Sequence, residues 1–254
     1  MKKLTSVTLA LCLLLSLFAF AANAADSITV TVTIADKTGK LVLAAEPVTV
    51  TDVDNDKAFT VHDTLTCAHE QYYGSKDGYQ AEASLLYDGL SLVKLWGETN
   101  NYSVGYYCND KSCWSLLDQV KQGDRVTAFA YKDAEKYSDV YTFCTPSSAA
   151  VKTGETLKLT VKKLQYDLLF NLIEIPAAGA RITVDGKATD YVVNDKGEVE
   201  ILILKPGKHV VSVTSDKEIL VPFAAKVQVS FNLISFAQWL YQTVVNWFTG
   251  LINR

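Results

Sequence analysis

Four aspartates in the twelve-residue stretch from position 52 to position 63 have the spacing that most clearly predicts chemistry. Asp52, Asp54 and Asp56 alternate, and Asp63 closes the stretch at its twelfth position. A hard cation such as Ca²⁺ takes about six to eight oxygen ligands, and alternating carboxylates can converge on one ion when the chain curls around it. Carboxylates held together without an ion repel one another and raise one another's pKa. The spacing therefore predicts a calcium site.

The other positions of this stretch suit a calcium loop with two departures. Ala58 needs to offer only its backbone carbonyl, Thr60 can bind directly or through a water, and the apolar Phe59 can attach the loop to a core. Lys57 stands where such loops use glycine for a left-handed turn, and Asp63 is shorter than the usual glutamate, so it would bind through one oxygen. The alternative is a solvated acidic turn in which the carboxylates point outward and Thr60 only caps the following helix.

This stretch resembles the calcium loop and following helix of dockerin modules. The residues that carry the likeness are Asp52-Val53-Asp54, Asp56, Thr60-Val61, Asp63 and Leu65. Dockerins contain two such repeats and bind cohesins, whereas this chain has one. The resemblance therefore implies calcium binding by the four aspartates and does not extend to cohesin binding.

Other groups that could do chemistry are few, because the chain has 3 His and 1 Met. Cys67 together with His62 would make a secreted hydrolase, provided that the fold brings them together. Cys67 and His69 are two residues apart on a predicted helix and face different directions. A zinc site from Cys67, His69, Cys108 and Cys113 is a further alternative, although the spacing is unlike a paired Cys-x-x-Cys frame. Nucleophile-elbow, phosphate-loop and His-Glu-x-x-His motifs are absent from the sequence, so we expect a protein that is not an enzyme.

The elements that must position the aspartates form a predicted α+β unit over residues 25–146. A helix is predicted over Phe59–Tyr73, with Thr60 as N-cap and Asp63 at capping-box spacing. Gly74 and Gly78 end it. Alternating apolar residues predict strands around this helix, over 27–34, 41–51, 90–96, 102–108, 125–132 and 140–144.

Three segments of this unit resemble secreted β-grasp domains of the transcobalamin C-terminal-like type. They are Leu95-Trp96-Gly97, Tyr102-Ser103-Val104-Gly105-Tyr106-Tyr107-Cys108-Asn109 and Val120-Lys121-Gln122-Gly123-Asp124-Arg125-Val126. The resemblance implies a surface binding module, which in some members of that family takes corrinoids. No motif in this sequence indicates a corrinoid ligand.

A second, β-only unit is predicted over residues 157–232, after a small and polar linker at 147–156. Short alternating strands with turn signals about every 8–12 residues predict a β-sandwich, so the fold class is mainly β. Three segments resemble carboxypeptidase-regulatory-like or related immunoglobulin-like modules of bacterial surface proteins, and this resemblance implies a spacing or supporting role. They are Gly179-Ala180-Arg181-Ile182-Thr183-Val184-Asp185-Gly186, Asn194-Asp195-Lys196-Gly197 and Leu204-Lys205-Pro206-Gly207.

The cysteines predict disulfides if the chain is exported. Four cysteines follow residues 1–24, and an even number of cysteines in an exported chain favours disulfide pairing. We expect Cys108–Cys113 to close a hairpin and Cys67–Cys144 to tie the helix to a late strand. Free buried thiols are the alternative.

The two ends of the chain predict contact with membranes or export machinery. Residues 1–24 read as a signal peptide, with Lys2 and Lys3, an apolar run and a small-residue cleavage site at Ala22-Asn23-Ala24; a retained membrane helix is the alternative. Residues 233–254 predict an apolar helix with a narrow polar stripe and no charge before Arg254. It could lie on a membrane surface, span the membrane, pack on the protein's own sheet or self-associate.

Aromatic residues are the remaining signal for binding. Trp96, Tyr102, Tyr106, Tyr107 and Trp114 surround the expected Cys108–Cys113 hairpin and form either a recognition patch for a peptide, glycan or planar ligand, or a small core. A net charge of −4 argues against nucleic acid as a partner.

Together these features predict an exported cell-surface or secreted binding or adhesion module, not an enzyme, stabilised by calcium. Its partner would be a protein, a glycan or a small molecule that the sequence does not identify. The alternatives are a hydrolase using Cys67 and His62, and a protein that acts through its C-terminal helix on membranes or on other copies.

Overall fold

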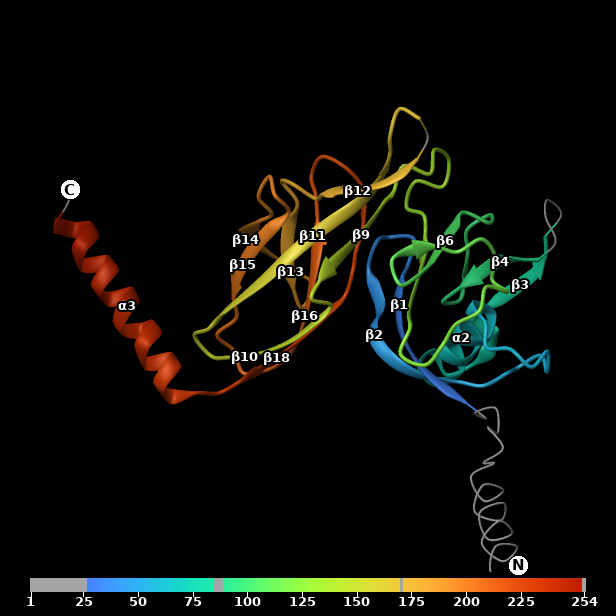
Figure 1. Cartoon of the computed structure of the whole chain (residues 1–254), viewed down its shortest axis with the longest axis horizontal. Coiled ribbons are helices and arrows are strands. Elements are labelled where there is room, and N and C mark those ends of the chain that lie inside the picture. The colour runs from blue at the N-terminus through green and yellow to red at the C-terminus, as the bar shows by residue number, and fades with distance from the viewer. Residues whose placement is uncertain (1–26, 85–88, 170, 253–254) are drawn as a thin grey trace, which may run out of the picture.

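The computed structural model describes residues 27–84, 89–169 and 171–252. It is mainly β, with two β-rich units side by side and a C-terminal helix (Figure 1). The expected signal peptide at residues 1–24 lies outside the described residues.

The first unit is built on a mixed sheet of five strands in the order β2-β1-β8-β6-β7. The hairpin of β1 (Ile28–Ala35) and β2 (Leu41–Val50) is antiparallel, and β1 also pairs in parallel with β8 (Arg125–Ala130). Beyond β8 the sheet continues with β6 (Val104–Cys108) and β7 (Lys111–Ser112), both antiparallel to their neighbours. The parallel pair therefore lies at the centre of the sheet.

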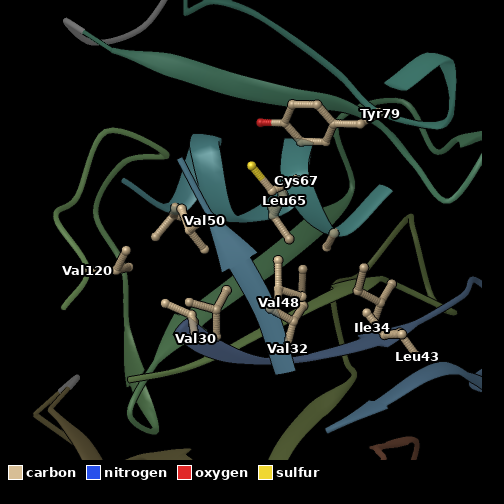
Figure 2. Packing of buried hydrophobic residues seen from close by; sticks show 14 of the residues in the cluster. Val30, Val32, Ile34, Leu43, Val48, Val50, Leu65, Cys67, Tyr79 and Val120 are labelled. Atoms are coloured by element: carbon tan, nitrogen blue, oxygen red, sulfur yellow. The ribbon is translucent and has the colours of Figure 1, made fainter. Parts of the chain in front are cut away.

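Helix α2 (Val61–Ala68) packs against this sheet and closes the first core. Leu65 on the helix and Val30 and Val32 on β1 are completely buried in one hydrophobic cluster (Figure 2). The helix is shorter than predicted, because after Ala68 the chain makes a π-turn, η1 (His69–Tyr73), and ends at a left-handed glycine. A 3₁₀ turn, η2 (Lys76–Gly78), follows.

A small antiparallel sheet completes the first unit. It consists of β3 (Gln80–Ala83), β4 (Leu90–Leu95) and β5 (Glu98–Thr99). Leu92 and Leu95 bury their side chains in the same cluster as α2, so this sheet covers the first core from the helix side.

The second unit is a β-sandwich of two sheets around a separate core. One sheet has the order β10-β18-β16-β13-β14 and contains β10 (Ser148–Lys152), β13 (Arg181–Val184), β14 (Lys187–Val192), β16 (Gly207–Thr214) and β18 (Ala225–Ser230). The other has the order β12-β11-β9-β17, with β15 also pairing with β11, and contains β9 (Val140–Thr145), β11 (Thr156–Tyr166), β12 (Leu172–Pro176), β15 (Glu198–Leu202) and β17 (Leu220–Val221).

The border between the units differs from the expected one. β9, expected in the first unit, pairs with β11 of the sandwich, and the expected linker at 147–156 contains β10, which pairs in parallel with β18. The physical reason is burial, since Cys144 on β9 lies in the sandwich core and Tyr141 and Phe143 lie in a third cluster. The units therefore meet between β8 and β9.

That third cluster joins the two units. Phe129 and Tyr107 of the first unit pack with Tyr141 and Phe143 of the second. The rings of Tyr107 and Tyr141 are stacked with their centroids 3.8 Å apart. The two units are therefore joined by a shared hydrophobic cluster as well as by the chain that connects them.

Helix α3 (Leu233–Ile252) follows β18 and projects away from the sandwich (Figure 1). Several of its apolar side chains are exposed, among them Tyr241 and Trp247. None of the helices in the described ranges meets the length and apolarity required to cross a bilayer.

Candidate functional site

The aspartate loop between β2 and α2 is folded by hydrogen bonds to its own carboxylates. Asp52 accepts the backbone N–H of Asp56 on Oδ1 (3.2 Å) and that of Lys57 on Oδ2 (2.9 Å). Asp54 Oδ1 also accepts from Asp56 N (3.3 Å), and Asp56 Oδ1 accepts from Ala58 N (2.8 Å). The chain therefore curls around its aspartates.

The backbone of this loop turns through two left-handed residues. Asn55 has a φ of 63° and Lys57 a φ of 70°. Asparagine adopts this region readily, whereas for lysine it costs about 1 kcal/mol. Lys57 thus takes the turn for which a glycine would be expected, and the departure noted in the sequence does not stop the loop from closing.

Three of the four aspartates converge. Asp52, Asp54 and Asp63 each offer a carboxylate oxygen, and these oxygens lie within 4.8 Å of one another. That separation is close to twice a Ca–O distance of about 2.4 Å, so one ion could contact all three. In the described ranges this is the one place where three metal-ligating side chains meet, and Asp56 lies outside it.

Asp63 also caps the helix. It is completely buried, its Oδ1 accepts from Val53 N (2.9 Å), and its Oδ2 accepts from Thr60 N (2.9 Å) and Thr60 Oγ1 (2.7 Å). Asp63 N in turn donates to Thr60 Oγ1, which confirms the predicted capping box. A carboxylate has about four lone-pair sites, so three donors leave one site for the aspartate group. The hydroxyl of Thr60 is engaged in the same cap, because it donates to Asp63 Oδ2 and accepts from Asp63 N.

The aspartates differ in how easily they ionise. Partial burial raises the pKa of Asp54, and repulsion from the carboxylates of Asp63 and Asp56 raises it further. The hydrogen bond from Asp56 N acts in the opposite direction but does not cancel this increase. Burial also opposes ionisation of Asp52, but the backbone N–H groups of Lys57, Asn55 and Asp56 outweigh it and lower the pKa. A cation between them would relieve the repulsion on Asp54.

Two flanking residues lie as the loop hypothesis expects. Phe59 packs against the first hydrophobic core, and Ala58 is half-buried beside it. The loop is therefore attached both to the core and to the start of α2.

The alternative catalytic pair does not form. Cys67 is buried, and its Sγ lies 3.7 Å from Thr51 Oγ1. His62 instead places Nδ1 2.8 Å from the hydroxyl of Tyr79. The thiol and the imidazole make separate contacts, so the hydrolase alternative lacks its nucleophile–base pair.

The alternative zinc set is not assembled either. His69 is completely buried, with Trp96 N donating to its Nε2 (2.9 Å) and its Nδ1 at 2.6 Å from the carbonyl of Leu65. Both ring nitrogens are therefore occupied by the backbone, and His69 acts as a structural residue.

The expected disulfides are not formed. The four cysteines within the described ranges are free thiols, and Cys67 and Cys144 lie in different cores, which makes their pairing wrong. On the β6–β7 hairpin Cys108 is opposite Lys111, and Cys113 N donates to Tyr106 O, so the register does not place Cys113 across from Cys108. Burial raises the pKa of Cys108 to about 11 and that of Cys113 to about 12.

The five aromatic residues around this hairpin do not make one patch. Tyr102 and Trp114 are exposed, whereas Trp96 and Tyr106 pack against the first core and Tyr107 stacks between the units. Most of the group is therefore core.

Sequence reasoning missed a polar network between the units. Arg125 Nη2 binds Asp110 Oδ2, and the hydroxyl of Tyr141 donates to Asp110 Oδ1 (3.1 Å) beside a hollow of about 240 Å³. The three residues are far apart in sequence, and no local pattern connects them.

Comparison with known proteins does not assign a family. No protein-family model and no curated protein matches the chain. Among solved structures, the fibronectin(III)-like modules of Clostridium thermocellum CbhA align at 13% identity over 50% of this chain and 77% of that chain, with a TM-score of 0.29. The N-terminal Ig1-2 module of the Drosophila receptor protein tyrosine phosphatase DLAR aligns at 12% identity over 61% and 76%, with a TM-score of 0.26. Scores this low carry no argument about function, and the sandwich is established by its own strand pairing.

Proposed function

We propose that this protein is an exported, non-enzymatic binding or adhesion module whose first unit is a β-grasp-like domain stabilised by Ca²⁺. The observation that carries the calcium proposal is the convergence of Asp52, Asp54 and Asp63 in a loop with two left-handed turns. The central parallel pair of β1 and β8, with α2 against the sheet, supports the β-grasp-like assignment.

In this proposal the ion joins two parts of the chain. Asp52 and Asp54 follow β2, and Asp63 belongs to the first turn of α2. Asp56, which lies outside the converging group, moves in to bind the ion together with the carbonyl of Ala58, and Thr60, whose hydroxyl is engaged in the cap, binds through a water. Binding would hold the loop against the helix and neutralise like charges.

The test is thermal unfolding of the full chain with millimolar Ca²⁺, with Mg²⁺ and with a chelator. Calcium at about 100-fold above its Kd adds about 2.7 kcal/mol to the free energy of unfolding, which raises the Tm by several degrees. Asp54→Ala abolishes the increase, while Asp195→Ala, an exposed aspartate in a turn of the second unit, keeps it. An unchanged Tm in calcium contradicts the proposal.

The exposed apolar side of α3 supports a second proposal, that this helix lies on a membrane surface. Leu233, Ile234 and Tyr241 are 68%, 70% and 71% exposed, and residues 231–253 include no charged residue. Binding to uncharged phosphatidylcholine vesicles is expected, with no gain from anionic lipid. Co-sedimentation that persists after deletion of residues 233–254 argues against it, and concentration-dependent dimers in ultracentrifugation favour self-association instead.

A further inference from the structure

A second hollow between the units, the inter-unit groove, has a volume of about 590 Å³. One wall is the turn between β1 and β2 at residues 38–41, and another is the segment 215–222 after β16. Thr183 on β13 and Val210 and Ser212 on β16 line its floor. Hollows of about 300–1,000 Å³ at domain interfaces are where small molecules bind.

The floor of this groove is the outer face of a sandwich sheet. Val211 and Val213 lie in the sandwich core, so Val210 and Ser212 point to the opposite side. Ser212 is directly opposite Thr183 on the neighbouring strand. Two hydroxyl-bearing side chains therefore lie next to each other on the groove floor.

Ser212 carries a polar atom with nothing to bind. The residue is 4% exposed, and its Oγ has no hydrogen-bond partner among the residues that the structure describes. Buried hydroxyls nearly always have a partner. The Oγ is covered in this rotamer, so a ligand's polar group would become its partner once the Ser212 side chain rotates toward the groove.

Two lysines, Lys40 and Lys132, and two acids, Asp185 and Glu218, line the groove. The ammonium groups of Lys40 and Lys132 lie more than 4.0 Å from every carboxylate in the described ranges, because no ion pair involves them. Asp36 Oδ1 accepts from Thr38 N, Thr38 Oγ1 and Lys40 N. Burial opposes ionisation of Asp36, but these bonds and the positive charge of Lys40 lower its pKa.

The acids that line the groove are already engaged. Glu218 binds Lys163 Nζ through both oxygens at 2.6 and 2.8 Å. Asp185 accepts from Val210 N (2.9 Å) and lies 2.7 Å from His209 Nδ1. Among the described residues, Lys40 and Lys132 are therefore the charged side chains of the lining that no hydrogen bond or ion pair holds in place.

We infer that the inter-unit groove binds an acidic saccharide, whose ring hydroxyls bond Ser212 and Thr183 and whose acidic group lies between Lys40 and Lys132. Hydroxyls on the floor suit a polyhydroxylated ring, and ammonium groups suit a carboxylate or a phosphate. This inference rests on the proposed function as a binding module and is independent of the calcium loop.

The test is calorimetric titration of the full chain at low salt with glucuronate, glucose 6-phosphate and glucose. One or both acidic sugars should bind at least about tenfold more tightly than glucose, which corresponds to one charge-assisted contact. Comparison of glucuronate with glucose 6-phosphate shows whether the groove prefers a carboxylate or a phosphate. Equal affinity for all three sugars, or no binding of either acidic sugar, overturns the inference.

Variants locate the site. Ser212→Ala should weaken binding of the acidic sugar about tenfold without lowering the Tm, because the hydroxyl has no partner in the protein. Lys40→Gln and Lys132→Gln should weaken the acidic sugar and leave glucose unchanged, while Lys196→Gln, an exposed lysine in a distant turn, changes neither. Unchanged affinity in Ser212→Ala overturns the assignment.

The titration is repeated with a chelator, which keeps the two proposals distinct. Sugar binding without a calcium effect on the Tm contradicts only the calcium loop, and a calcium effect without sugar binding contradicts only the groove.

Discussion

Lys57 shows how single residues in the aspartate loop balance strain against hydrogen bonding. Its φ of 70° is unfavourable for a residue with a Cβ. Its backbone N–H donates to Asp52 Oδ2 at 2.9 Å. The loop therefore keeps its shape at the expense of local strain, which is common at binding sites.

Replacing Lys57 with glycine should stabilise the protein. Relief of the left-handed strain of about 1 kcal/mol is partly offset by the extra entropy of glycine in the unfolded chain, for a net gain of up to about 0.5 kcal/mol in the free energy of unfolding. Urea denaturation measures this gain. Asn55→Gly is the matched control and should change stability by less, because asparagine already tolerates its φ of 63°. A loss of stability in Lys57→Gly contradicts this account.

His69 should make stability depend on pH. Burial lowers its pKa from 6.5 against a smaller opposing contribution from the Leu65 carbonyl. Protonation would place a proton on Nε2, where Trp96 N already donates. Below about pH 6.5 His69 becomes protonated in the unfolded chain but stays neutral in the folded chain. The contribution of neutral His69 to the free energy of unfolding is therefore complete above about pH 6.5, and it is lost as the pH falls towards the lower pKa of the folded state.

The measurement is the urea midpoint between pH 7.5 and pH 5, which should fall with pH. His69→Gln should remove most of that slope while lowering stability at pH 7.5, because the bond to Trp96 N is weakened. An equal slope in both proteins would show that other groups cause it.

At the scale of elements, the junction between the sandwich and α3 depends on one glycine. Gly154, in the turn between β10 and β11, has a φ of 89°, and a Cβ there would lie 2.6 Å from the Ser235 carbonyl oxygen and 3.2 Å from Trp239 Cβ. The first turns of α3 therefore approach the sandwich backbone closely, whereas later residues such as Tyr241 are exposed.

Gly154→Ala should release the start of α3. The added methyl group cannot fit against the Ser235 carbonyl, so cleavage by protease within residues 231–239 should become faster. Gly179→Ala is the control, because Gly179 has a similar φ of 80° with no atom within 4 Å of the added Cβ. Both variants carry the backbone cost of about 1 kcal/mol, and only the first should expose the helix junction.

At the scale of the whole molecule, the two units behave as one body because they share the cluster around Tyr107 and Tyr141. An ion pair between Lys226 Nζ and Glu46 Oε2 (2.6 Å) joins them at a second place. Shared apolar surface couples unfolding more strongly than such a partly exposed pair does.

Tyr141→Ala should lower the free energy of unfolding by about 3–5 kcal/mol and divide one calorimetric transition into two. Tyr141→Phe keeps the stacked ring and loses the bond to Asp110, so it should cost about 1 kcal/mol and keep a single transition. Two transitions in the unaltered protein would contradict the shared core.

Local features were predictable from the sequence because they depend on residues a few positions apart. The capping box of Thr60 and Asp63 was confirmed, and so was the burial of the apolar face of β1, although Thr33 and Ala35 on its other face are buried as well. The aspartate spacing predicted carboxylates that converge on one calcium ion; in the structure Asp52, Asp54 and Asp63 converge, and calcium binding stays a prediction.

Long-range features were decided by the tertiary structure. β9 joins the sandwich because its side chains are buried on both faces, and this pairing places Cys144 in a different core from Cys67. The inter-unit groove combines Lys40, Lys132 and Ser212, which no sequence period relates. The sequence by itself determined the local turns, caps and strand faces, since these require only neighbouring residues. Which faces meet was settled by packing, because burial of apolar surface selects among pairings that local patterns leave equal.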